Sequence, residues 1–273
     1  MKIKDFFLSQ EEFEIAETET KGVLITQPLP SNISKYYESK NYISHHQDSG
    51  STKEKIYKFL QTFNLLYKKK ILLERLKKGS KVLDYGCGAG EFVKFIENDF
   101  VTFGFEPNSN ARNAALNKTA KTKIIDDLNA VSDQSLDAIT LWHVFEHIDN
   151  QKEILAAFHS KLKEKGLLII AVPNFTSYDA KHYKEFWAAY DVPRHVFHFS
   201  KSGMENLISK LPEWQLIKIK PLLLDSFYIA LLSEKYKKSS LFWLKALFHG
   251  TASNVKAIFT TEFSSLIYII EKK

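Results

Sequence analysis

The stretch VLDYGCGAGEF, residues 82–92, places three glycines between an apolar strand and the start of a helix. Such a junction needs backbone torsions closed to most side chains, and it lets a ligand approach bare main chain. A dinucleotide-binding loop has its third glycine three residues after the second, but Gly90 follows Gly88 by two. Glu91 and Asp84 add carboxylates that would repel a pyrophosphate. The loop therefore favours a ligand with cationic groups.

Strand and helix patterns alternate after this loop. Apolar runs flanked by amphipathic segments predict a parallel sheet that is covered by helices on both faces. The expected strands are 81–85, 101–106, 123–125, 136–142 and 167–173, and the expected helices between them are 91–97, 109–117 and 151–163, the last stopped by Gly166.

The flanking segments define the domain organisation. Residues 1–52 are expected to form an N-terminal arm with a hairpin around Gly22, and residues 53–273 the main domain, which begins with a long helix over 53–78. Within it, we expect a helix at 201–211, a strand at 214–220 and a last strand at 263–270. Residues 174–200 are interpreted as a substrate loop, and residues 222–260 as a helical lid or dimer insertion.

Composition excludes several classes of protein. The chain has 273 residues, a net charge of +6 and one cysteine, Cys87, which rules out an intramolecular disulfide. Only three residues are arginines, so nucleic-acid binding is not expected, and the lysine clusters at 68–70, 77–81 and 235–238 are interpreted as solvated surface. No apolar run reaches the roughly 20 residues of a membrane span, and the N-terminus turns acidic within a dozen residues. A cytoplasmic protein, monomeric or homodimeric, is expected.

Two acidic positions follow the next strands. Glu106 ends the second strand twenty residues after Gly86, where a carboxylate can accept hydrogen bonds from both hydroxyls of a ribose. Asp126 and Asp127 follow the third strand, where a carboxylate can meet an adenine amino group or simply cap a loop.

The motifs VLDYGCGAG, FGFEPN, IIDDL, LDAITLWHVFEHI and GLLIIAVPN together resemble the class I S-adenosylmethionine-dependent methyltransferases. They are most similar to the small-molecule branch related to quinone-biosynthesis O-methyltransferases. The resemblance implies a Rossmann-like sheet of seven mostly parallel strands, the last antiparallel, and S-adenosylmethionine as cofactor. The cofactor-binding residues that it implies are Asp84, Gly86, Cys87, Gly88, Gly90, Glu106, Pro107, Asp127, Leu128, Trp142 and His143, with Tyr37, Tyr42 and His45 of the arm closing the site.

The stretch WHVFEH, residues 142–147, also spells the H-x-x-E-H order of an inverted zinc-peptidase helix. Because it directly follows a buried strand at the carboxyl edge of the sheet, a substrate site is favoured over zinc, and no metal is expected. We expect His147, and less directly His143, to face the substrate; either one could instead cap the helix or pack beneath it.

A second cluster, FWAAYDVPRHVFHFS at 186–200, resembles D-x-P-R-H segments in this branch. The resemblance implies a substrate pocket shaped by Trp187, Tyr190, Arg194 and His198, with Arg194 binding an acidic group. His195 rivals His147 as the catalytic base. The alternative is an aromatic plug in which Arg194 pairs with Asp191.

The predicted function is methyl transfer by in-line displacement to a small-molecule acceptor, either to a hydroxyl whose proton a histidine removes or, as alternatives, to a nitrogen or a carbon. A nucleic-acid or protein methyltransferase lacks support because LWHV replaces the tetrapeptide of base-modifying members. A nicotinamide-dependent oxidoreductase and a catalytically silent binding module of the same fold remain as alternatives.

Overall fold

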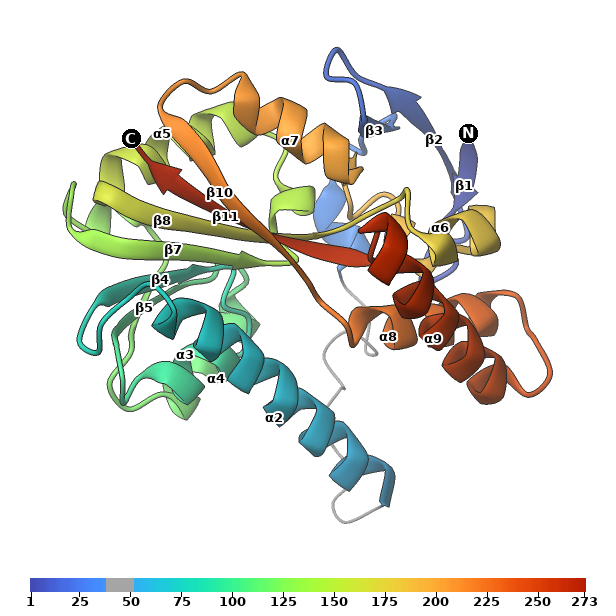
Figure 1. Ribbon diagram of the computed structural model, residues 1–273, viewed down its shortest axis with the longest axis horizontal. Helices are drawn as coiled ribbons and strands as arrows, with labels where there is room; N and C mark the ends of the chain where they lie inside the picture. Colours follow the sequence, from blue (N-terminus) through green and yellow to red (C-terminus); the bar gives the residue numbers. More distant parts are fainter. Residues whose placement is uncertain (38–51) are drawn as a thin grey trace.

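A twisted sheet of seven strands organises the molecule, and the computed structural model describes residues 1–37 and 52–273 (Figure 1). The strands, in spatial order, are β10 (Trp214–Pro221), β11 (Ser265–Lys272), β8 (Leu162–Pro173), β7 (Leu136–Trp142), β4 (Lys81–Tyr85), β5 (Val101–Phe105) and β6 (Lys123–Ile125). All neighbours pair in parallel except β11, which is antiparallel to both β10 and β8. The predicted seven-stranded, mostly parallel sheet is thus confirmed.

Helices cover both faces of this sheet. Figure 1 shows α2, α3 and α4 on one side and α5 and α7 on the other. The helices are α2 (Thr52–Leu73), α3 (Glu91–Ile96), α4 (Ser109–Lys118), α5 (Gln151–Lys161), α6 (Tyr178–Tyr183), α7 (Lys201–Ser209), α8 (Asp225–Tyr236) and α9 (Phe242–Thr260). Among the described residues, no helix combines the length and the hydrophobicity that a membrane crossing requires.

Strand β8 shows why the sheet needs cover on both sides. Its side chains alternate between two apolar clusters, one with α2 and α3 and one with α5 and α7. Each fully buried leucine or isoleucine contributes roughly 1.5–3 kcal/mol of transfer free energy. The residues facing α2 and α3 are Leu167, Ile169 and Ala171, and those facing α5 and α7 are Leu168, Ile170 and Val172.

Two boundaries differ from the sequence expectation. Helix α5 ends at Lys161, and β8 begins at Leu162, five residues before the predicted start. Leu162 and Leu167 both pair with β7, with a register irregularity between them, and Lys165 has a φ of 60°. Gly166 therefore lies in an interruption of the strand and does not stop the helix.

The N-terminal arm contributes to a second sheet. Strands β1 (Lys2–Lys4), β2 (Glu12–Glu17) and β3 (Val23–Gln27) are antiparallel, and β2 and β3 form the expected hairpin around Gly22. Strand β9 (Phe197–Phe199) pairs with β3 and completes the sheet. Because β9 belongs to the segment interpreted as the substrate loop, the arm and that segment form one structural layer. Short 3-10 helices lie at Ile33–Tyr36, Leu128–Ala130, Phe145–His147, Lys184–Phe186 and Ala188–Tyr190.

Candidate active site

The glycine loop lies at the carboxyl end of β4 and is held by main-chain bonds. Gly86 and Cys87 donate their N–H groups to the Phe105 carbonyl at 2.7 and 2.9 Å. Gly86, Gly88 and Gly90 all have positive φ, which disfavours any other residue. A Cβ on Gly86 would lie 2.5 Å from the Val144 side chain, whereas one on Gly88 would meet no described atom within 4 Å. The main chain at Gly88 therefore borders open space.

Glu106 ties this loop to the end of β5. Its carboxylate accepts a hydrogen bond from the Gly88 N–H and another from the Asn108 N–H, each at 2.9 Å. The side chain is almost fully buried. A carboxylate has about four lone-pair sites, so two acceptor positions remain for a ligand. The position predicted to bind a ribose therefore also orders the glycine loop.

Asp84 lies beneath the loop in a buried position. Its Oδ1 accepts a 2.7 Å bond from the Thr140 hydroxyl. Burial raises the pKa of Asp84 to about 7, although Thr140 and Lys68 favour the charged form. Lys68 of α2 lies with its Nζ 4.6 Å from the centre of the Trp142 ring, and burial lowers its pKa. A lysine of α2 thus reaches the carboxyl edge of the sheet beside Asp84 and Trp142.

His143 has a different role from the one that a zinc-peptidase helix would give it. Its φ is +57°, and only residues 145–147 form a short 3-10 helix, so His143 and His147 do not share a helical face. Its Nε2 lies 2.8 Å from Asp225 and its Nδ1 3.4 Å from Glu146. Burial alone would lower the pKa of His143, but the two carboxylates raise it to about 10. His143 is therefore a partly exposed imidazolium, held between Asp225 and Glu146.

His147 and His195 approach each other in front of Glu146. Their ring centres are 4.6 Å apart. His147 Nδ1 lies 2.8 Å from the Arg194 carbonyl, and His195 Nδ1 lies 2.9 Å from the Ala189 carbonyl. Because a carbonyl can only accept, each Nδ1 carries the proton and each Nε2 keeps a lone pair. The Tyr37 hydroxyl lies 3.1 Å from His147 Nδ1.

Burial distinguishes these two histidines as proton acceptors. His195 is nearly fully buried, and desolvation together with His147 lowers its pKa to about 4. His147 is only partly buried. Ligand atoms of Glu146, His147 and His195 all lie within 4.8 Å of one another, so this trio has the residues and spacing of a metal site.

Arg194 is paired within the protein. Its guanidinium contacts Asp5 at 2.9 Å and Asp191 at 2.6 Å, and it donates to the Tyr36 carbonyl at 3.2 Å. The side chain is 1% exposed. The expectation that Arg194 binds an acidic acceptor is not supported, because these partners neutralise its charge and take up its donors.

The other residues of this segment are also packed inside the protein. Trp187 donates to Asp179 at 2.7 Å and meets Tyr190 edge-on, with ring centres 5.0 Å apart. His198 on β9 lies 2.9 Å from the Thr26 hydroxyl of β3. Trp187, Tyr190 and His198 are all buried, so the arrangement matches the aromatic plug that the sequence left as the alternative.

The remaining predicted cofactor residues border the glycine loop or follow β5 and β6. Cys87 is buried, which raises its pKa to about 12 and keeps it a thiol. The Pro107 carbonyl accepts from Arg112 at 2.9 Å. Asp127 is exposed and caps the 3-10 helix that begins at Leu128. Tyr42 and His45, which are predicted to close the site, lie outside the described residues.

Three residues of this site were not assigned a role from sequence. Lys68 belongs to a lysine run interpreted as solvated surface, Asp225 opens α8 more than 130 residues after the glycine loop, and the sequence singles out Glu146 only as part of WHVFEH. Only the E-H pair of WHVFEH could have indicated Glu146.

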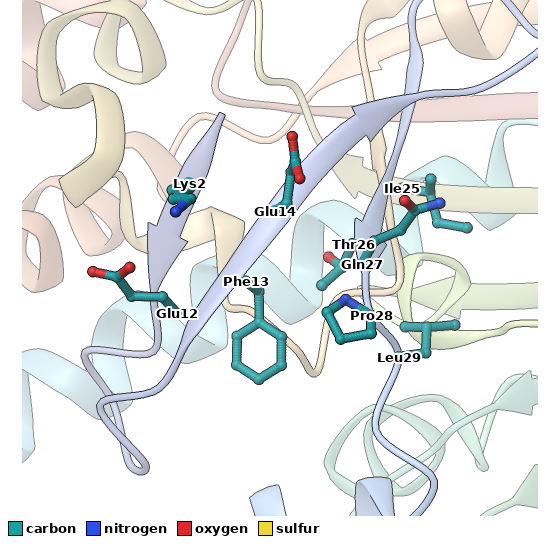
Figure 2. A pocket seen from close by; sticks show the side chains of 9 residues that line it. All are labelled: Lys2, Glu12, Phe13, Glu14, Ile25, Thr26, Gln27, Pro28 and Leu29. Atoms are coloured by element: carbon teal, nitrogen blue, oxygen red, sulfur yellow. The ribbon is translucent and has the colours of Figure 1, made fainter.

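A hollow of about 770 Å3 lies on the arm (Figure 2). It is lined by Lys2 of β1, by residues of β2 and by the end of β3. None of the predicted site residues lines it, so it does not enter the assignment of the active site.

Comparison with known protein families identifies the core of the chain. A family profile described as a methyltransferase domain matches residues 57–211, more than half of the chain. An uncharacterized protein of Methanocaldococcus jannaschii, MJ1252, is 28% identical over 194 residues, which cover 66% of this chain and 73% of that protein.

Solved structures share the fold at low sequence identity. Phosphoethanolamine N-methyltransferase 2 of Haemonchus contortus, solved with phosphomonomethylethanolamine and S-adenosylhomocysteine, has a TM-score of 0.55 and 15% identity. The match covers 92% of this chain but only 62% of that one. Cyclopropane synthase MmaA2 of Mycobacterium tuberculosis has a TM-score of 0.50 and 15% identity, over 75% of this chain and 83% of that chain.

Proposed function

Because this chain belongs to the methyltransferase-domain family, we propose that it transfers a methyl group from S-adenosylmethionine to a hydroxyl of a small-molecule acceptor. The observation that carries the proposal is the open space beside Gly88, at a main chain that the Glu106 carboxylate holds in place. Because the sequence motifs resemble those of quinone-biosynthesis O-methyltransferases, we expect the acceptor to be a flat or lipophilic hydroxylated compound.

S-adenosylmethionine is the cofactor, and the residues present fit it. The Asp84 carboxylate suits the cationic methionine part, and the free lone pairs of Glu106 suit the ribose hydroxyls. Asp127 and Leu128 would border the adenine, and Trp142 would lie beside the cofactor. These positions follow strand ends at the carboxyl edge of the sheet, where open α/β folds bind their ligands. S-adenosylhomocysteine in the Haemonchus structure supports this assignment.

The cofactor supplies a methyl group activated by a sulfonium. The protein must orient the acceptor and take its proton, and a positioned base contributes about 10²–10⁴-fold in rate. We assign this role to His147 Nε2, because the Arg194 carbonyl holds the proton of the neutral ring on Nδ1. His195, with its pKa near 4, is a poorer proton acceptor at neutral pH.

Replacement of Gly88 tests the proposal against a matched control. Asn tolerates positive φ, so Gly88→Asn should fold but fill the space beside the loop. Gly79→Asn is the control, since Gly79 also has positive φ and open space but lies in the turn before β4. Calorimetric titration with S-adenosylmethionine should show binding by the wild type and Gly79→Asn and none by Gly88→Asn.

The alternatives give different results. Wild-type protein that ignores millimolar S-adenosylmethionine but binds reduced nicotinamide dinucleotide would be an oxidoreductase. Protein that binds S-adenosylmethionine but releases no S-adenosylhomocysteine with any hydroxylated aromatic compound in a screen would be a silent module.

A further inference from the structure

Helix α9 packs with its small residues inward. Ala246, Gly250, Ser253 and Ala257 are buried, and their spacing of four, three and four residues places them on one face. A Cβ on Gly250 would lie 2.6 Å from the Phe227 ring, so α9 approaches α8 closely along this face. The buried face of α9 therefore consists of small residues.

Those large apolar side chains point outward. Ile258 is 68% exposed, Phe248 67% and Phe259 85%, and Trp243 is half-exposed at the start of the helix. Single exposed apolar residues are common, but a continuous stripe on one helix marks an interaction surface. The stripe, called here the α9 face, consists of Leu244, Leu247, Phe248, Val255, Ile258 and Phe259. Figure 1 shows the α8–α9 pair at one end of the molecule, beyond the edge of the large sheet.

The segment that contains this face is rich in lysine and lacks acidic residues. From Lys235 to Thr261 the sequence contains five lysines and no aspartate or glutamate. All five are exposed and none forms an ion pair with another described residue, although Lys235, Lys237 and Lys256 each lie over an aromatic ring, of Phe242, Tyr183 and Tyr178 respectively. Lys245 and Lys256 each stand three residues before a phenylalanine of the α9 face, Phe248 and Phe259, so they neighbour it on the helix surface. The other three are Lys235 in the last turn of α8 and Lys237 and Lys238 in the connection to α9.

We propose that the α9 face docks the protein onto the surface of an anionic lipid bilayer. The helix would lie in the plane of the interface, with the α9 face at the boundary between head groups and acyl chains and the lysines on lipid phosphates. Trp243 has the amphipathic ring that favours this depth. A second copy of the chain suits the face less well, because a symmetric contact would bring two lysine-rich surfaces together. This docking is independent of the proposed reaction.

Vesicle co-sedimentation of the full chain tests the proposal. We expect the protein to pellet with vesicles of phosphatidylglycerol and phosphatidylcholine in equal parts, and to bind vesicles of phosphatidylcholine alone far more weakly. Raising the salt concentration should weaken binding, because it screens the lysines. Replacing Lys237, Lys238, Lys245 and Lys256 by Gln should lower the affinity for anionic vesicles about fivefold for each lysine removed.

A matched pair of variants tests the apolar contribution. The triple variant Phe248→Ser, Ile258→Ser and Phe259→Ser should lose at least roughly tenfold in affinity for anionic vesicles. Val101→Ser with Leu116→Ser is the control, because these residues are half-exposed on β5 and α4 and should not affect binding. Thermal unfolding checks that both variants are folded.

Three outcomes would overturn the proposal. The first is absence of pelleting with either kind of vesicle. The second is equal binding by the triple variant and the control. The third is a dimer in sedimentation equilibrium that the triple variant dissociates, which would assign the α9 face to a second copy of the chain.

Discussion

The glycine loop and the segment 186–200 both contain residues that the sequence singled out, yet only the loop borders open space. Gly86 and Gly88 have the positive φ angles that the motif requires, and Gly88 meets no described atom where a side chain would be. In the second segment, Trp187, Tyr190 and Arg194 are buried against the protein itself. Dense polar and aromatic residues therefore indicate a site only when the backbone also leaves room for a ligand.

The two regions differ in where their partners come from. The glycine loop is bonded to residues of the adjacent strand, about twenty positions away. Arg194 pairs with Asp5, 189 positions away, and His198 forms a hydrogen bond with Thr26 of the same arm. A local pattern predicts the first kind of contact and cannot predict the second.

The largest expected effect is the loss of activity when His147, the proposed base, is replaced. His147→Ala should lower kcat by about 10²–10⁴-fold, because the acceptor hydroxyl loses its base. Affinity for S-adenosylmethionine should be unchanged in calorimetry. The assay is release of S-adenosylhomocysteine with an acceptor found by screening; unchanged kcat in this variant would remove His147 from the mechanism.

Arg194→Met tests whether the 186–200 segment is structural. Removing the guanidinium leaves Asp5 and Asp191 without their partner, and breaking a buried ion pair costs about 3–5 kcal/mol in the free energy of unfolding. Urea unfolding measures the loss, with Arg75→Met as control because Arg75 is exposed. If Arg194→Met kept wild-type stability but bound the acceptor poorly, Arg194 would instead be a substrate-binding residue.

Asp84, beneath the glycine loop, should make the affinity for S-adenosylmethionine depend on pH. With a pKa of about 7, Asp84 is charged above this pH and neutral below it. If only the carboxylate attracts the cationic part of the cofactor, affinity for S-adenosylmethionine should fall about tenfold between pH 8 and pH 6. Calorimetry at several pH values should show this fall in the wild type and a flat profile in Asp84→Asn; parallel profiles would assign the effect to another group.

The smallest expected effect concerns metal ions. Turnover should be insensitive to chelators, because the proposed chemistry needs only a base and oriented substrates. The prediction can be tested at one place, because the ligand atoms of Glu146, His147 and His195 are close enough together to hold a metal ion. Equimolar zinc in the purified protein, lost together with activity on chelation, would show that this trio holds a metal.

Sequence predicted the fold well because strand and helix periodicity is local. The five strands from β4 to β8 and the last strand β11 are all present in the structure. The main error lies at Gly166, because a glycine can mark either the end of a helix or an interruption of a strand. The site was predicted in part. Residues at strand ends lie where the motif order implies, but Lys68 and Asp225 reach the site from α2 and α8, and only tertiary packing brings them there.

Calorimetric titration of Glu106→Ala with S-adenosylmethionine tests the central claim most directly. The variant loses the carboxylate that orders Gly88 and is proposed to bind the ribose, and a hydrogen bond to a charged group contributes about 1.5–3 kcal/mol. Glu91→Ala is the control: the Glu91 carboxylate pairs with Lys118, so the structure does not support the expectation that Glu91 attracts a cationic ligand. The account predicts at least a roughly tenfold weaker affinity for Glu106→Ala and wild-type affinity for Glu91→Ala. Undiminished affinity of Glu106→Ala would contradict it.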